Sequence, residues 1–344
     1  NEGHASFLIL ELLSDTKVNG IDNFDEMYDF EGVKKRMVFT THTPVAAGHD
    51  KFDPPLVKDI IGENVDHALL DHFTHDGKIN MTHIALECSD HVNGVAKKHA
   101  EVSRGMFPDY TIRAITNGVH SRTWTSEPMA KVFDKYIPDW KDDPMSLRFA
   151  MLIPDEDLWN AHMESKRKFI DHVNGCCHTN FNAEVFTIGF ARRATLYKRM
   201  DMIFQDKGWL KYISESVGKI QIVFAGKAHP QDEGGKELIR RLFAIKDELK
   251  GSVEIAYLEN YNMELSSMMI PGVDVWLNTP LRPREASGTS GMKAAHNGVP
   301  QFSILDGWWI EGCLENVTGW SIGPLQQENN TEEDAKDMYK KLQH

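Results

Sequence analysis

Cysteine, long apolar runs and excess positive charge are all scarce in this sequence. The four cysteines among its 344 residues are Cys88, Cys176, Cys177 and Cys313. Their spacing fits neither disulfides nor zinc, which favours reduced thiols in a cytoplasmic protein. The adjacent pair followed by His178 leaves a metal site as a weaker alternative. The apolar run Phe7–Leu13 is short, contains Glu11 and follows no basic segment, so we expect neither a signal peptide nor a membrane span.

The balance of charge excludes some classes of partner. With 38 basic and 51 acidic residues the formal net charge is −13, which argues against nucleic acid or an anionic membrane as the main partner. A local basic pocket for phosphate is compatible with that balance. The length suffices for two domains with cores of their own. Because the chain begins at Asn1 with a helix-like pattern that runs to Leu13, we expect it to be a fragment.

Apolar strand-like and helix-like segments alternate in the second half of the chain. The strand-like segments are Val185–Ala191, Lys219–Gly226, Val253–Leu258, Val273–Asn278 and Gln301–Leu305. Helix-like segments between them include Glu237–Lys250 and Met263–Met269. This order predicts an α/β fold with a doubly wound parallel sheet.

The first half shows a less regular alternation. Met37–Thr41 and Tyr110–Ile115 read as strands, and Asn80–Phe107 reads as two helices separated at Asn93-Gly94. The polar segment His178–Ala183 looks like a link between domains. We therefore predict one domain over residues 1–180, a second over 181–325, and a truncated polar helical tail over 326–344.

One stretch, Thr279–Gly307, carries the strongest indication of chemistry. A Gly/Ser/Thr loop, Glu285–Gly291, precedes a short helical piece, Met292–His296. Glycines let a ligand approach the backbone, and unpaired N–H groups at a helix start attract anions. Lys293 beside such a site suggests a Schiff-base lysine that holds pyridoxal phosphate. The alternative is an ordinary turn followed by a solvated lysine.

Basic residues gather directly after the strand Val185–Ala191. The four cations of this eight-residue segment are Arg192, Arg193, Lys198 and Arg199. At the carboxyl edge of a parallel sheet such a cluster forms an oxyanion site, because guanidinium groups match phosphate geometry. A solvated basic patch is the alternative.

Other candidate groups have weaker signals. His67, His72 and His75 lie in a helical segment at spacings that make a poor metal-binding face, so no metal site is predicted. Asp306 and Glu311 are acid/base candidates near the end of the stretch, with turn formation and packing as the alternative.

Several segments resemble the α-glucan phosphorylases, the family of glycogen, starch and maltodextrin phosphorylases. The resemblance rests first on R-P-R-E-A-S-G-T-S-G-M-K-A-A-H-N-G-V-P and D-G-W-W-I-E-G, which are closest to the short prokaryotic branch. It also rests on N-E-G-H, F-T-T-H-T-P-V-A-A-G-H-D, T-N-G-V-H-S-R-T-W and a segment similar to K-R-x-x-x-Y-K-R. In that family the lysine eight residues after the glutamate carries the cofactor, which corresponds to Lys293. Related nucleotide-sugar glycosyltransferases have a second glutamate there.

The resemblance implies a set of site residues. Cofactor contacts would come from Lys293, Arg192, Tyr261, Thr289 and Ser290. Substrate contacts would come from His42, Tyr197, Glu285, Ser287 and Gly288. Arg193 and Lys198 would bind inorganic phosphate and complete the catalytic set with Lys293. Arg192 stands where many members of the family have lysine.

The resemblance also implies an architecture and a reaction. The fold would be GT-B, with residues 1–180 as part of a glucan-binding lobe and 181–325 as the domain that binds pyridoxal 5'-phosphate. The reaction would be phosphorolysis of an α-1,4-glucan or maltodextrin by inorganic phosphate to α-D-glucose 1-phosphate, with retention. A homo-oligomer and allosteric control are open expectations.

Two other functions are alternatives to phosphorolysis. One is a nucleotide-sugar-dependent glucan synthase of the same fold, against which Lys293 speaks. The other is a glucan-binding fragment without catalysis, because the family's Gly-rich loop over the substrate phosphate would precede Asn1. We expect the 344-residue chain alone to be weakly active or inactive.

Overall fold

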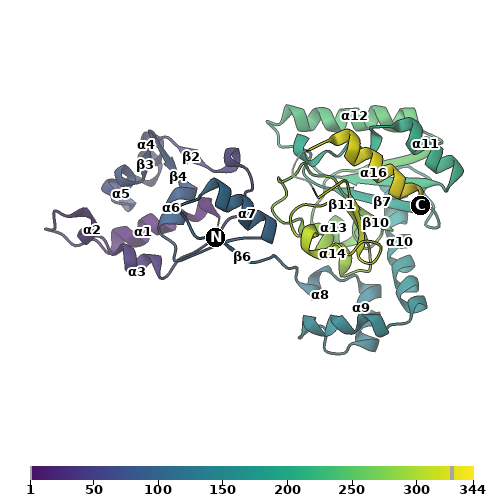
Figure 1. Ribbon diagram of the computed structural model, residues 1–344, viewed down its shortest axis with the longest axis horizontal. Helices are drawn as coiled ribbons and strands as arrows, with labels where there is room; N and C mark the ends of the chain where they lie inside the picture. Colours follow the sequence, from purple (N-terminus) through teal and green to yellow (C-terminus); the bar gives the residue numbers. More distant parts are fainter. Residues whose placement is uncertain (1, 326–328) are drawn as a thin grey trace. The chain divides into compact units, whose positions relative to one another are not determined.

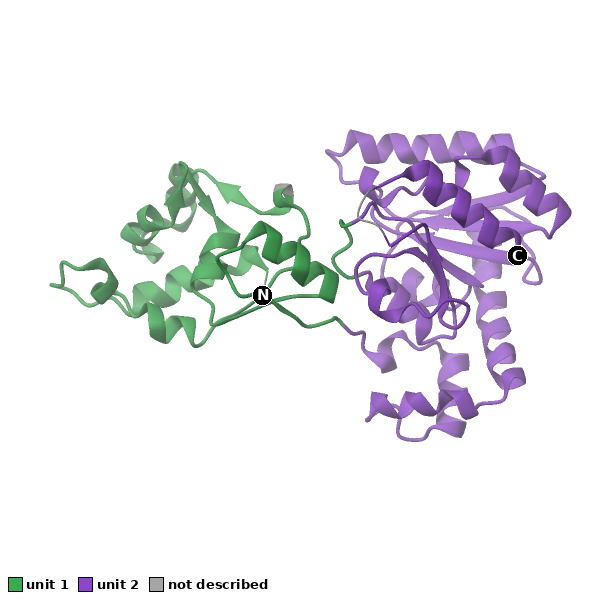
Figure 2. Ribbon diagram, viewed as in Figure 1, with its two compact units in different colours: residues 1–117, 283–287 green, residues 118–282, 288–344 purple. Residues whose placement is uncertain are grey.

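The computed structural model describes residues 2–325 and 329–344 (Figure 1). It divides into two compact units (Figure 2). Unit 1 consists of Asn1–Asn117 and Pro283–Ser287, and unit 2 of Gly118–Arg282 and Gly288–His344. Every helix among the described residues is too short or too polar to cross a bilayer.

Unit 1 contains two small sheets. Strands β1 (Val38–Thr40), β5 (His91–Gly94) and β6 (Arg113–Ala114) pair in parallel, in that order. Strands β2 (Lys51–Phe52), β4 (Lys78–Asn80) and β3 (Thr74–His75) pair antiparallel. The helices are α1 (Phe7–Asp15), α2 (Phe24–Met27), α3 (Phe30–Lys34), α4 (Pro54–Ile61), α5 (His67–His72), α6 (Met81–Glu87) and α7 (Lys97–Met106), with 3-10 turns at Gly3–Ala5, Ala46–Gly48 and Gly62–Asn64.

The two helices predicted on either side of Asn93-Gly94 are present, but the strand between them was not predicted. The Asn-Gly pair ends strand β5, between helices α6 and α7. A Cβ on Gly94 would lie 2.9 Å from the backbone nitrogen of Ala100, so glycine is required where the strand packs closely on helix α7. Asn93 is buried and its carboxamide oxygen accepts a hydrogen bond from Thr40 on β1.

Unit 2 is built on a six-stranded sheet in which every neighbouring pair is parallel. The strands lie in the order β12 (Gly319–Ile322), β11 (Gln301–Ile304), β10 (Val275–Asn278), β7 (Phe186–Ala191), β8 (Ile220–Ala225) and β9 (Val253–Leu258). The helices are α8 (Ser121–Trp124), α9 (Glu127–Tyr136), α10 (Asp155–Cys177), α11 (Lys207–Ser216), α12 (Glu233–Leu249), α13 (Met263–Met269), α14 (Thr289–Ala295), α15 (Trp309–Gly312) and α16 (Thr331–Gln343), with 3-10 turns at Pro144–Leu152, Leu196–Lys198 and Met202–Phe204. The predicted α/β class with a parallel sheet is confirmed.

Helices cover both faces of this sheet (Figure 1). Alternate strand residues point to opposite faces, so Ile222 joins a core with helices α11, α12 and α16, whereas Val223 joins a core with α10, α13 and α14. Both residues are fully buried. Two separate apolar layers therefore hold the sheet in place.

The predicted domain ranges differ from these units. Residues 118–180 belong to unit 2 because helix α10 buries Phe169, Ile170 and Val173 against the sheet. The segment predicted as a link is also packed there, since Phe181 lies in the same core and Asn182 exchanges hydrogen bonds with Gln221. The boundary therefore falls between Asn117 and Gly118.

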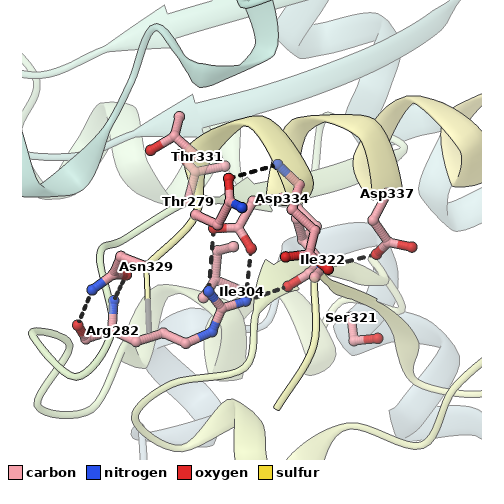
Figure 3. A network of polar contacts seen from close by, with 12 residues as sticks. Thr279, Arg282, Ile304, Ser321, Ile322, Asn329, Thr331, Asp334 and Asp337 are labelled. Atoms are coloured by element: carbon pink, nitrogen blue, oxygen red, sulfur yellow. Dashed lines mark hydrogen bonds and ion pairs between the residues drawn. The ribbon is translucent and has the colours of Figure 1, made fainter. Parts of the chain in front are cut away.

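The end of the chain also packs on unit 2 rather than forming a separate tail. Residues 326–328 lie outside the described residues, and helix α16 buries Ala335, Met338 and Tyr339 in the core. The carboxylate of Asp334 on this helix is buried between Arg199 and Arg282. Its contact with Arg282 is drawn in Figure 3.

Candidate functional site

The strand order of unit 2 creates a switch point between β7 and β10. From β7 the chain winds outward through β8 and β9, and from β10 it winds the other way through β11 and β12. Open parallel sheets bind ligands at the carboxyl ends of the two strands that flank such a point. Arg192 directly follows β7, and its guanidinium donates a hydrogen bond to the carboxamide oxygen of Asn278, the last residue of β10. The predicted basic segment therefore begins at the ligand-binding edge.

The predicted cations have different surroundings. Arg192 is half-buried, Arg193 is exposed, and Lys198 is buried with its amine 4.7 Å from the ring centroid of Tyr197. These residues lie together on the segment that leaves β7. Their role as phosphate and substrate contacts stays a prediction.

Arg199, the fourth cation of the segment, has a structural role. Its guanidinium donates to the backbone oxygens of Thr279 and Pro280 and forms a 2.9 Å ion pair with Asp334. Arg282 contacts the same carboxylate at 3.0 Å (Figure 3). The Arg199 guanidinium therefore links the segment after β10 to helix α16, and it does not belong to the predicted oxyanion site.

Tyr261 lies within electrostatic range of the basic segment. Its hydroxyl donates to Ser266 over 2.9 Å. Burial raises the pKa of this phenol, and the nearby charge of Arg192 acts in the opposite direction. The predicted cofactor contacts Arg192 and Tyr261 are thus neighbours in unit 2.

Lys293 lies on helix α14, in the connection from β10 to β11. Its side chain is half-buried, and its amine lies 3.3 Å from the ring centroid of Trp124. Burial lowers the pKa of this amine below its ordinary value. Within residues 2–325 and 329–344 the amine has no hydrogen-bond or ion-pair partner. A desolvated lysine without an acidic partner is suited to react as a free amine with a carbonyl.

The loop before Lys293 is shorter than predicted. Helix α14 begins at Thr289, so Thr289, Ser290 and Gly291 form its first turn instead of a loop. Gly288 precedes it with φ of 90°, a conformation that favours glycine. Gly291 has a packing reason, because a Cβ there would lie 1.4 Å from the side-chain oxygen of Gln301.

The predicted substrate residues are divided between the units. Tyr197 and Gly288 belong to unit 2, whereas His42, Glu285 and Ser287 belong to unit 1. In unit 1, His42 is exposed after β1, and its backbone N–H donates to Glu2 over 2.6 Å. Both Glu285 and Ser287 are buried, and the Ser287 hydroxyl has no hydrogen-bond partner among the described residues.

The remaining candidates have structural surroundings. Asp306 is buried and accepts the backbone N–H of Gly307, as a turn residue does. Glu311 lies in helix α15. Among the described residues no group of three or more His, Cys, Asp or Glu side chains could hold a metal ion, and all four cysteines are free thiols.

Two residues next to Lys293 were missed as functional in the sequence. Trp124 lies within the segment T-N-G-V-H-S-R-T-W, yet only contact with the lysine shows its importance. Asn297 reads as a helix-stop residue before glycine, but it is buried and its amide bonds to both Lys293 and Trp124. Trp124 is far from the lysine in sequence, and the four-residue spacing of Asn297 from Lys293 does not distinguish a helix-stop residue from one that also bonds to a distant segment.

The residues around Lys293 fit the predicted pyridoxal phosphate. The half-buried amine without a partner suits covalent attachment of the aldehyde, and the flat ring of Trp124 suits contact with an aromatic cofactor. Arg192 supplies a cation at the same edge of the sheet for a phosphate group.

Comparisons with known proteins agree with this geometry. A profile of the family described as carbohydrate phosphorylase matches residues 32–322. Maltodextrin phosphorylase of Thermococcus litoralis is 36% identical over 378 residues, covering 100% of this chain and 45% of that protein. Glycogen phosphorylase of Aquifex aeolicus is 36% identical, covering 100% and 55%, and that of Mycobacterium bovis is 34% identical, covering 94% and 42%. The chain thus spans about half the length of these relatives.

Proposed function

The chain belongs to the carbohydrate phosphorylase family, and from that premise we propose that the whole protein is an α-glucan phosphorylase. It transfers a glucosyl unit from the end of an α-1,4-glucan to inorganic phosphate and releases α-D-glucose 1-phosphate with retention. The architecture is GT-B, in which the sheet of unit 2 forms one of two Rossmann-like domains. The cytoplasmic location expected from the cysteines stays a prediction, as do the homo-oligomeric state and the allosteric control.

The observation that carries this proposal is the environment of Lys293. A nucleotide-sugar synthase of the same fold has an acidic residue at this position, whereas this chain has an amine that is half-buried on Trp124. Lys293 therefore holds pyridoxal phosphate, with Thr289, Ser290, Arg192 and Tyr261 as its further contacts. When bound, the cofactor supplies its phosphate as an acid/base or electrostatic partner of the substrate phosphate.

The residues of this chain bind and neutralise the reacting anions. Arg193 and Lys198 hold inorganic phosphate, whose proton goes to the leaving glycosidic oxygen and whose oxygen then attacks the glucosyl carbon from the same face. Tyr197, Gly288, Glu285, Ser287 and His42 contact the glucan. Preorganised cations at developing negative charge are each typically worth roughly 3–4 kcal/mol of barrier. The scheme requires neither a metal ion nor a pair of catalytic carboxylates.

Absorbance and product analysis of the full-length protein test the proposal. The purified protein should show the near-ultraviolet absorbance of bound pyridoxal and should release glucose 1-phosphate from maltodextrin and phosphate. Lys293→Ala should lose both properties. Glucosyl transfer from a nucleotide sugar by a protein without bound pyridoxal would instead establish the synthase and overturn the proposal.

A further inference from the structure

The end of helix α14 is tied to the segment that carries Trp124. The carboxamide of Asn297 donates to the backbone oxygen of Trp124 over 2.7 Å and to that of Lys293 over 2.8 Å. Its oxygen accepts the backbone N–H of Ser126 over 2.7 Å. One side chain therefore bonds to the lysine that bears the amine and to both ends of Trp124–Ser126.

These three bonds define the orientation of the amide. Two carbonyl oxygens face its nitrogen and one N–H faces its oxygen, so a flipped amide would meet like groups at every contact. Asn297 is 1% exposed, and a buried amide that lost these partners would bear the full cost of desolvation. The contact is therefore a fixed part of the folded unit.

A second contact ties the other end of helix α8 to helix α14. The Ser121 hydroxyl lies 2.9 Å from Nε2 of His296, and Ser121 is buried. Trp124 lies between this contact and the one from Asn297. Helix α14 has seven residues, and a helix of this length does not persist without tertiary contacts.

We propose that Asn297 is a positioning residue whose carboxamide keeps the ring of Trp124 beneath the amine of Lys293. The amide bonds the carbonyls of both residues and so limits the distance between their backbones, which keeps the ring within reach of the amine, now 3.3 Å from the ring centroid. The contact between amine and ring would set the direction from which Lys293 meets pyridoxal phosphate, and this part of the inference rests on the proposed function.

Ring-current shifts measure this geometry directly and do not require the cofactor. The full-length protein is first treated with hydroxylamine to remove pyridoxal phosphate, and its lysines are then reductively methylated with ¹³C-formaldehyde. The Lys293 amine lies 3.3 Å from a ring centroid, nearer than the amines of Lys135 and Lys198 at 4.7 Å and of Lys141 at 5.5 Å, so its methyl resonance should appear furthest upfield of these. Lys293→Arg assigns the resonance, and Trp124→Ala gives its position without the ring.

Asn297→Ala should move the Lys293 resonance most of the way to its position in Trp124→Ala. In the Trp124→Ala background the same substitution should have no further effect, because Asn297 acts through that ring. Asn297→Ser, which retains a small polar side chain, gives the same measurement if the alanine variant does not fold.

Asn174→Ala is the matched control. Asn174 also bonds through its amide to a neighbouring segment, donating to the oxygen of Phe181 and accepting its N–H, but it lies on helix α10 and its bonds reach neither Lys293 nor Trp124. This variant should lose stability and keep the upfield resonance. An unchanged resonance in Asn297→Ala, or an equal change in Asn174→Ala, would overturn the inference. Absence of pyridoxal absorbance before treatment would overturn the proposed function alone.

Discussion

Two groups of basic side chains in unit 2 show opposite surroundings although they come from adjoining stretches of sequence. Arg199 and Arg282 are buried against Asp334, and they join the segments after β7 and β10 to helix α16. Arg193 is exposed, and Lys293 has an amine without an acidic partner among the described residues. The difference indicates that a carboxylate within reach, and not the basic residue itself, separates a structural cation from one available to a ligand.

A third cluster extends this comparison to the opposite edge of the sheet. Lys166 is 3% exposed, and its amine lies 2.6 Å from Asp274, just before strand β10. The same carboxylate accepts from His162 over 2.9 Å and from the N–H of Thr187 over 2.7 Å. Lys166 is therefore structural by the same criterion, contact with a carboxylate. Replacement of Asp274 should lower the free energy of unfolding.

Asp334→Asn should have the largest effect on stability. The substitution retains the shape of the side chain but leaves Arg199 and Arg282 buried without a counter-charge, which should cost about 3–5 kcal/mol of unfolding free energy. Urea unfolding followed by circular dichroism measures the loss. Glu332→Gln, which breaks an exposed pair with Lys336 on the same helix, should change the unfolding free energy far less. Equal losses of unfolding free energy in Asp334→Asn and Glu332→Gln would show that the buried ion pairs contribute no more than the exposed one.

Asp274→Asn should cost about 3 kcal/mol at neutral pH, the lower end of the range for a broken buried pair, since Asp274 is 14% exposed. Burial alone would raise the pKa of Asp274, but hydrogen bonds from His162 and Lys166 outweigh it and lower the pKa. A carboxyl whose pKa is lower in the folded state contributes stability above its ordinary value, and this contribution disappears as the pH falls through the lowered value. The gap between wild type and variant, measured by urea unfolding from pH 7 downward, should therefore close below about pH 4. A gap independent of pH would show that Asp274 acts without its charge.

The sequence predicted the elements whose signals are local. Strand and helix periodicity predicted the parallel sheet of unit 2, and the four cations after β7 were recognised as a segment at its ligand-binding edge. The motif around Lys293 led to the prediction that this lysine carries the cofactor, because that prediction depends on a short run of residues, and the role stays a prediction. The Asn-Gly pair at Asn93-Gly94, which is typical of a turn, gave no indication of strand β5, whose buried end it forms.

Contacts between distant segments could not be predicted from the sequence. Arg199 resembled its neighbours until Asp334, 135 residues later, was found beside it. Asn297 and Trp124 meet across 173 residues, and their meeting depends on the packing of α8 against α14. Periodicity specifies neither the order of strands in a sheet nor which helices pack against one another, and these pairings depend on both.

Lys293→Met tests what a half-buried cation without an acidic partner among the described residues costs the folded protein. Burial lowers the pKa of this amine, so the folded state at neutral pH bears the cost of a partly desolvated charge, which disappears as the pH rises through the lowered value toward the ordinary one. Methionine should raise the unfolding free energy of the cofactor-free protein by about 1 kcal/mol or less, because attraction to the Trp124 ring offsets part of that cost. Thermal unfolding at pH 7 and pH 10 measures the gain, which should shrink at the higher pH. Lys168→Met, at an exposed pair with Glu164, is the control and should change little.

Arg193→Gln should have the smallest effect on stability. It therefore gives the most direct test of whether cations without a carboxylate contact serve a ligand, because any loss of activity cannot come from unfolding. Arg193 and Arg199 are the same residue type six positions apart, one exposed and the other buried on Asp334. The first substitution should change unfolding free energy by no more than about 0.5 kcal/mol. If Arg193 holds the substrate phosphate, however, phosphorolysis by the full-length protein should fall roughly 100- to 1000-fold.

Arg199→Gln should show the reverse pattern, with lower stability and with activity preserved in the molecules that remain folded. Loss of activity in Arg199→Gln at temperatures where circular dichroism shows it folded would mean that the buried cations also act on the reacting phosphates, and the division by carboxylate contact would no longer hold.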